Sequence, residues 1–223
     1  MLARSDSLRF TAGDIRLALA LMGYIAVLAV FPLVLPEAQF RWTFSEAGPF
    51  ERFAIAAWLF AAVVVLARIR PLGARAWAFA ILCVLFAARE ADWHKAFTAD
   101  SILKSNYYRH TVAPLSEKIV AGIVAVAAIA LIIYVGLLIA RFLLRQGGWR
   151  SRAGVWLILA TVLVLAGKVL DRAPAVLFEE YGIALSPLVG HYSAAFEEGM
   201  EAIHALLLAW SVWISQTEKR FLS

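Results

Sequence analysis

Cysteine and charge are both scarce in this sequence. One of the 223 residues is a cysteine, Cys83, which excludes a disulfide within the chain and any metal motif built on several cysteines. Charged residues make up 17% of the chain and hydrophobic residues 63%, whereas an ordinary soluble domain has about a quarter and about a half. A water-soluble core cannot enclose so much apolar surface, but a lipid bilayer can. The composition therefore predicts an integral membrane protein.

Motifs that bind phosphate or activate a serine are also missing. The chain has no glycine-rich phosphate loop and no Gly-x-Ser-x-Gly turn. Its net charge of +5 does not indicate a nucleic-acid partner, because the basic residues stand beside apolar segments, where they report membrane topology. Since the chain also has no repeat and no interdomain linker, residues 1–223 are expected to form a single integral membrane domain without a nucleic-acid partner.

The apolar residues are gathered in about six runs. Three runs reach the ~20 residues that a membrane-spanning helix needs, and three shorter ones extend into polar residues at one end. Each run is expected to be a helix, because a helix satisfies its own backbone hydrogen bonds in lipid. The first run is longer than the apolar core of a signal peptide and is expected to be an uncleaved helix. The predicted fold is an all-α, polytopic transmembrane helical bundle with spans at roughly 15–35, 51–67, 76–91, 118–140, 153–170 and 195–215.

The distribution of charge predicts the orientation of these spans. An even number of spans leaves both termini on one side, which would hold 12 basic and 3 acidic residues, against 9 basic and 13 acidic on the other. The positive-inside rule then places both termini in the cytoplasm, with the protein in a bacterial inner membrane. The outer connections, 36–50, 92–117 and 171–193, are the longer ones, and the histidines and most carboxylates fall on that side. We therefore expect function on the outer, periplasmic side.

The third predicted span ends in a polar cluster. On a continuing helix, Glu90 and His94 lie one turn apart on the same face. A carboxylate and an imidazole at that spacing can share a metal ion or a proton. The same pattern is typical of a helix end at the membrane interface, with Trp93 in the aromatic belt.

The sixth predicted span carries charges well inside its apolar length. Glu197, Glu201 and His204 follow one helical stripe, and Glu198 lies beside it. Ionisable groups within a membrane are costly unless they pair, bind a metal or line water, so this stripe is expected to be functional. The Glu201-x-x-His204 spacing is also the one that carboxylate-bridged di-metal bundles use.

Other polar residues stand near these clusters. Glu51 and Lys168 are placed to complete a site or to pair with it. Asp171 and Arg172 are interpreted as a surface pair or a helix-end cap, and residues 107–109 as interfacial anchors.

The residues of the third span resemble a known copper site. Glu90-Ala-Asp-Trp93-His94, followed by Asp100 and His110, resembles the first copper-site segment in the C subunit of membrane-bound copper monooxygenases, which oxidise methane or ammonia. The resemblance implies that Glu90, His94 and His110 are metal ligands. The chain departs from the pattern in having Glu90 where that family has an aspartate.

A second segment is similar to a later part of the same subunit. Gly190-His191, then Glu197-Glu198, then His204 follow in its order, which implies ligand roles for His191 and His204. Pro187 stands where that family has an asparagine ligand. More broadly, Glu-x-Gly-Pro-x-Glu at residues 46–51 resembles a pattern of uncharacterised bacterial multi-pass inner-membrane proteins, which implies no activity.

Several functions remain open from the sequence. One is a metal-dependent membrane enzyme or monooxygenase-like subunit that holds copper, iron or zinc at the periplasmic side. The alternatives are a proton-relay or transport protein, a haem-binding electron carrier with His94 and His204 as axial ligands, and a non-catalytic subunit or assembly factor. The expected partners are membrane lipids and either membrane-protein subunits or a second copy of the chain. The candidate metal ligands are Glu90, His94, His110, His191, Glu197, Glu201 and His204.

Overall fold

The protein is described by a computed structural model that covers residues 10–45, 48–96, 98, 100–102 and 104–215, with only the backbone of His94. Throughout that part of the chain the regular structure is helical and contains no strand, which confirms the all-α prediction. The long helices are α1 (Ala12–Val34), α3 (Pro49–Arg68), α4 (Ala74–Glu90), α7 (Leu115–Ala140), α8 (Arg152–Tyr181) and α9 (Pro187–Ser215). The short ones are α2 (Glu37–Thr43), α5 (Trp93–Ala96), α6 (Ser105–His110), the π-helical η1 (Arg141–Arg145) and the 3₁₀-helical η2 (Gly148–Arg150).

Four helices are long and apolar enough to cross a membrane. They are α1, α3, α8 and α7 with its continuation to Arg145, and they coincide with four of the predicted spans. The other two predicted spans are also helical, as α4 and α9. However, α4 has 17 residues, and α9 carries three glutamates and two histidines between residues 191 and 204. The described residues therefore support four spans by length and composition, and the count of about six is not confirmed.

The connections at the carboxylate-rich end contain more helix than expected. α8 continues to Tyr181 and ends at Gly182, whose φ of 66° is a left-handed value that glycine adopts without strain. α9 begins only a few residues later, at Pro187. The predicted loop over 171–193 was thus wrong for most of its length, because its polar residues extend two helices.

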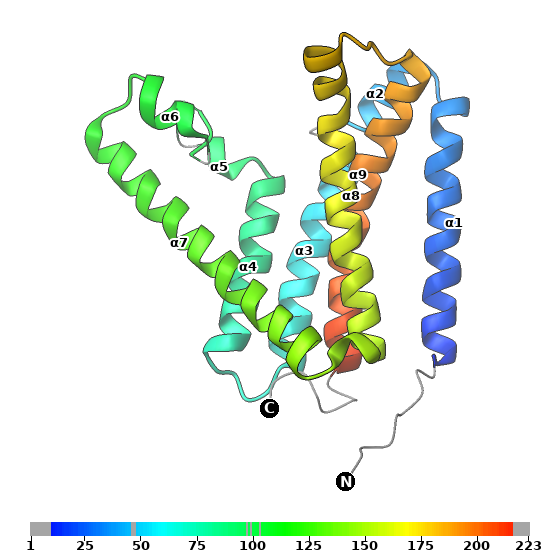
Figure 1. Ribbon diagram of the computed structural model, residues 1–223, viewed down its shortest axis with the longest axis vertical. Helices are drawn as coiled ribbons and strands as arrows, with labels where there is room; N and C mark the ends of the chain where they lie inside the picture. Colours follow the sequence, from blue (N-terminus) through cyan, green and yellow to red (C-terminus); the bar gives the residue numbers. More distant parts are fainter. Residues whose placement is uncertain (1–9, 46–47, 97, 99, 103, 216–223) are drawn as a thin grey trace.

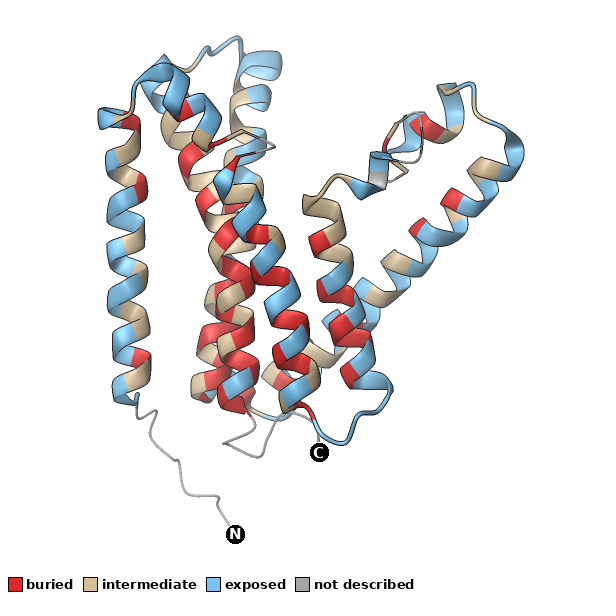
Figure 2. Cartoon of the chain, turned by 180° about the vertical axis from the view of Figure 1, so that it is seen from behind, coloured by how far each residue is buried: buried red, intermediate tan, exposed pale blue. Residues whose placement is uncertain are grey.

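α9 lies at the centre of the bundle, against α8, α3 and α1 (Figure 1). Small residues make this possible: Ala195, Ala202 and Ala205 are fully buried, and a side chain at Gly199 would collide with Leu28 of α1. Small residues let helices approach closely where lipid supplies no hydrophobic driving force between them. Figure 2 accordingly shows buried residues concentrated on α3, α4, α8 and α9, whereas α1 and α7 are largely exposed.

α7 leaves the bundle at a slant (Figure 1). It contacts α4 near its end, where Val135 is buried, and diverges from it toward α6. At the far end Tyr107 of α6 donates a hydrogen bond of 2.6 Å to Glu117 of α7. Burial and this hydrogen bond raise the pKa of Tyr107 to about 12. Tyr107 is therefore buried and joins α6 to α7, a contact that its interpretation as an interfacial anchor did not include.

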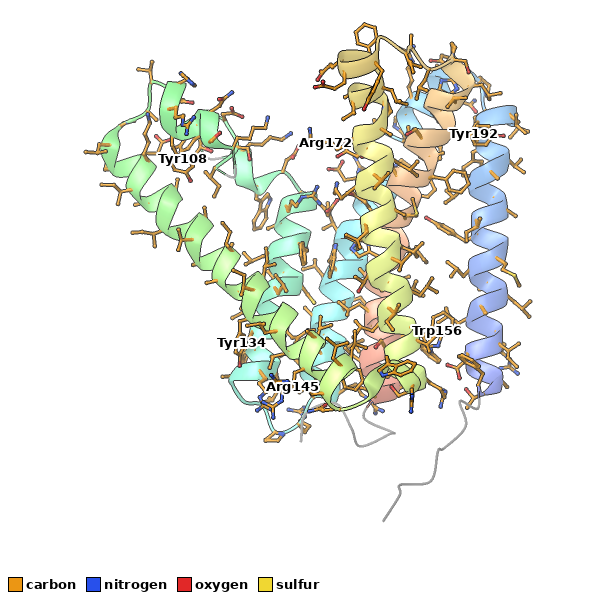
Figure 3. The ribbon with its side chains drawn as sticks, viewed as in Figure 1. Tyr108, Tyr134, Arg145, Trp156, Arg172 and Tyr192 are labelled. Atoms are coloured by element: carbon orange, nitrogen blue, oxygen red, sulfur yellow. The ribbon has the colours of Figure 1, made fainter. Side chains whose placement is uncertain are left out.

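A buried carboxylate joins three helices at the arginine-rich end, where Arg145 and Trp156 lie in Figure 3. Asp14 is 1% exposed and caps α1 together with Thr11. Its Oδ2 accepts from Arg152 of α8 at 2.7 Å. Its Oδ1 accepts from the indole nitrogens of Trp156 at 2.9 Å and Trp210 at 3.4 Å. These bonds fix α1 to α8 and α9.

We expect Asp14→Asn to lower the free energy of unfolding by about 3 kcal/mol, because it leaves the Arg152 guanidinium without its buried counter-charge. Unfolding by sodium dodecyl sulfate titration in mixed micelles measures the loss. Glu179→Gln, which neutralises an exposed carboxylate on α8, is the matched control and should change stability little. Equal stability of Asp14→Asn and the control would contradict a structural role for this cluster.

Candidate functional site

The sequence-predicted carboxylates gather around one polar cavity. It has a volume of about 210 Å³ and lies between the start of α3, the end of α4, α8 and the first half of α9, at the end of the bundle that carries Arg172 and Tyr192 (Figure 3). We call it the carboxylate cavity. Its lining residues are Glu51, Arg89, Glu90, Asp92, Lys168, Asp171, Glu197, Glu198 and Glu201.

Local backbone rules explain why these residues reach the cavity. Gly48 and Pro49 begin α3, and Glu51 follows in its first turn, where the helix dipole favours a negative charge. On α9, residues 197 and 201 are one turn apart, so their side chains lie on the same face. Lys168 and Asp171 stand three residues apart on α8, at the other side of the cavity.

The end of α4 differs from the prediction. Glu90 is its last residue, and Asp92 adopts a φ of 56°, a left-handed value that interrupts the helix before α5. Glu90 and His94 are therefore on two separate helices, and the expected continuous helical face was wrong. The side chain of His94 lies outside the described part of the structure.

Two basic side chains form ion pairs with carboxylates of the cavity. Lys168 Nζ lies 2.5 Å from Glu201 Oε1 and 3.8 Å from Asp171 Oδ2, and Arg89 lies 2.7 Å from Glu90 Oε1. The side chain of Glu90 is 8% exposed and that of Glu201 13%, so the two carboxylates are largely buried, whereas Arg89 and Lys168 reach solvent.

The carboxyl groups also contact one another. Those of Glu90 and Glu201 lie within hydrogen-bonding reach, as do those of Glu197 and Asp171. Two ionised carboxylates repel, whereas a carboxylic acid donates to a carboxylate, so each such contact favours one shared proton. Seven carboxylates against two bases leave five negative charges to be offset if all are ionised. The arrangement is therefore suited to holding protons or another cation.

The three histidines whose side chains the structure describes do not line the carboxylate cavity. His191 Nε2 lies 3.1 Å from Glu37 Oε2, and the His191 ring lies against Phe40 with centroids 4.3 Å apart, so it connects α9 to α2. A hydrogen bond from Arg41 lowers the pKa of Glu37 and keeps it available to His191 as an anion. His110 is exposed at the end of α6.

His204 is buried one turn below Glu201. Its Nδ1 lies 3.1 Å from the carbonyl oxygen of Met200, and its ring meets that of Trp58 edge to face. Of the predicted ligands, the structure thus brings together Glu90, Glu197 and Glu201. Among the described residues, no group of three or more His, Cys, Asp or Glu is arranged to hold a metal ion.

The structure adds cavity residues that the sequence did not select as site residues. Asp171 forms the predicted surface pair with Arg172 at 4.0 Å, and its contact with Glu197 also places it at the cavity. Lys168, Glu51 and Glu198 were recognised only as neighbours. The available signal was spacing: Lys168 and Asp171 stand three residues apart on one helix, the pattern of a common face.

Comparison of the chain with protein-family models, with curated proteins and with solved structures found no match.

We expect Lys168 and Glu201 to be coupled by about 1–2 kcal/mol in a double-mutant cycle, because Lys168→Met leaves a largely buried carboxylate uncompensated and Glu201→Gln removes it. Detergent-titrated unfolding of the two single variants and the double variant gives the coupling energy. The exposed pair Lys104 and Asp100, at 3.8 Å, is the control and should couple by less than about 0.5 kcal/mol. Coupling no larger than in the control would show that the pair does not organise the cavity.

Proposed function

We propose that the chain is a six-span membrane protein with its arginine-rich end in the cytoplasm of a bacterial cell and its carboxylate cavity facing the periplasm. The four apolar helices support a membrane location, and the packing of α4 and α9 among them supports the proposal that these are two further spans. Arginines cluster at the turns of one end and carboxylates at the other, the bias that the positive-inside rule requires.

Within that frame, the protein works as a proton-binding relay on the outer side of the membrane. The observation that carries this proposal is the contact between the carboxyl groups of Glu90 and Glu201, with Lys168 on the same glutamate. A proton shared between the two acids can move to the Glu197 and Asp171 pair across the same cavity. Lys168 contacts the same glutamate and supplies a positive charge beside the shared proton.

The arginine-rich half of the bundle supports a relay confined to the outer side. Two of its buried polar groups are bonded to fixed partners: Asp14 lies in its cluster, and Ser211 donates to the carbonyl oxygen of Ala153. Such groups do not form a chain along which a proton can cross the membrane. The proposed role is therefore to collect protons and deliver them to a reaction or partner at the periplasmic face.

The predicted copper, iron or zinc centre remains the competing proposal for this cavity. Three of its predicted ligands, Glu90, Glu197 and Glu201, line the cavity, and carboxylates also bind metals. The proton relay is favoured because the observed contacts join carboxyl groups to one another and to Lys168 rather than to the histidines.

We expect infrared difference spectra between about pH 8 and about pH 5 to contain a carboxylic-acid carbonyl band that Glu201→Gln removes or shifts, because the shared proton loses one of its two sites. The measurement uses the full chain in lipid nanodiscs. Glu179→Gln, an exposed carboxylate outside the cavity, should leave the band unchanged.

Metal analysis of the same preparations separates the two proposals. A relay requires no metal, and its infrared band should persist after treatment with a chelator. Stoichiometric copper, iron or zinc that is lost in both Glu201→Gln and His204→Ala would overturn the relay and establish the metal centre. If Glu201→Gln and His204→Ala give the same infrared spectrum as the wild type, and the preparations contain no metal, the carboxylate cavity is not the functional site.

A further inference from the structure

A groove lies between α7 and the segment that carries α5 and α6, where α7 slants away from the bundle (Figure 1). Its volume is about 670 Å³, which is within the range of ligand-binding sites. We call it the α7 groove. Its walls come from Trp93 of α5, from Ile102 in the connection to α6 and from one face of α7. None of its lining residues belongs to the carboxylate cavity.

One stripe of α7 forms the long wall of the groove. Glu117, Val120, Ala121 and Val124 follow one another at spacings that place them on a common helical face. The stripe begins with a carboxylate in the first turn of α7 and continues as hydrocarbon for about 10 Å, at a rise of 1.5 Å per residue. The groove is therefore polar at the end near α6 and apolar along its length.

The carboxylate at the polar end has an oxygen available for a ligand. Glu117 Oε1 accepts a hydrogen bond from Tyr107, and its Oε2 accepts from no group in the described part of the chain. None of the ion pairs among the described residues reaches Glu117, and the neighbouring Lys118 donates to the carbonyl oxygen of Tyr108 instead. A carboxylate without a counter-charge beside an apolar wall attracts a cationic group that can donate hydrogen bonds.

Trp93 adds an aromatic ring to the same groove. The residue is 61% exposed although it lines the groove, so part of its indole is open to a ligand. Indole rings favour the headgroup level of a membrane, and their faces attract ammonium groups. Glu117 and Trp93 thus supply, from two different helices, two kinds of group that bind an ammonium ion.

The apolar part of the groove is open on the lipid-facing side of α7. Val120 and Val124 line it and are exposed. Within a membrane such a surface is covered by a lipid chain or by another helix. A lipid with a cationic headgroup group matches both the carboxylate and the hydrocarbon wall, whereas an apolar helix matches only the wall.

We infer that the α7 groove binds one phospholipid whose headgroup ends in a primary ammonium group, the class of phosphatidylethanolamine. The ammonium group donates to Glu117 beside the ring of Trp93, and one acyl chain follows Val120 and Val124. This inference requires a membrane location but not the proton relay, so lipid binding and the relay can fail independently.

The test counts the lipids bound to the delipidated full chain by native mass spectrometry, with phosphatidylethanolamine, phosphatidylcholine and phosphatidylglycerol of the same acyl chains as probes. We expect the wild type to bind one phosphatidylethanolamine about tenfold more tightly than phosphatidylcholine, because a trimethylated ammonium group cannot donate a hydrogen bond to a carboxylate. Glu117→Gln keeps an acceptor for Tyr107 and removes the charge, so it should abolish this preference and leave phosphatidylcholine binding unchanged. Glu179→Gln, at an exposed carboxylate on α8, is the matched control and should retain the preference.

A second variant tests the apolar wall and keeps the test decisive if Glu117→Gln fails to fold. Val124 lines the groove and is 48% exposed, so Val124→Trp fills the groove and should abolish tight binding of phosphatidylethanolamine. Val126→Trp, at a residue of α7 that is 67% exposed and outside the groove lining, is its control and should bind as the wild type does.

Three outcomes would contradict the inference. Wild-type binding of phosphatidylethanolamine no tighter than that of the other two lipids, or undiminished binding to Val124→Trp, would overturn the site. A dimeric chain that binds no lipid would assign the groove to a second copy of the protein. An equal loss of all three lipids in Glu117→Gln would overturn the role of the carboxylate.

Discussion

The whole arrangement depends on keeping the carboxylates of α9 away from hydrocarbon. Glu197, Glu198 and Glu201 occur on a helix that turns apolar within one further turn, so their charges cannot be exposed to lipid without a large cost. In the bundle, the polar ends of α3, α4 and α8 surround that half of α9. The central position of α9 follows from this requirement.

Small residues provide the space that the polar contacts need. Gly199 brings α9 close to α1, and the Tyr24 hydroxyl of α1 donates to the Gly199 carbonyl at 2.7 Å. Gly167 of α8 lies opposite Met200 and Glu201. Close backbone approach on these sides aligns Lys168 with Glu201, because the two residues then face each other across a narrow helix pair.

The two ends of the bundle differ in the contacts that join their helices. At the arginine-rich end, Asp14 accepts short hydrogen bonds from two residues of α8 and a longer one, of 3.4 Å, from Trp210 of α9. At the other end, α7 diverges and is joined to α6 rather than to the bundle, while His191 and Glu37 connect α9 to α2. The carboxylate cavity lies at this second end of the bundle.

Composition and hydrophobic runs were sufficient to predict an all-helical chain and to locate its long helices, because apolar length and the loss of water around the backbone act along the chain. The carboxylate stripe on α9 could also be predicted, since residues 197 and 201 share a face in any helix. The sequence could not identify the basic residue that contacts Glu201, because that contact depends on how α8 packs against α9. Lys168 was only one of several candidates.

The tertiary structure alone decided which polar residues meet. Asp92 turns the chain after Glu90, which separates Glu90 from His94 although their spacing favours a common face. His191 contacts Glu37 and Phe40, and His204 contacts Met200 and Trp58. The sequence by itself determined that the chain is helical and apolar and that one helix carries carboxylates, because those properties follow from each segment alone. The composition of the cavity was decided by tertiary structure, because it depends on contacts between helices distant in the chain.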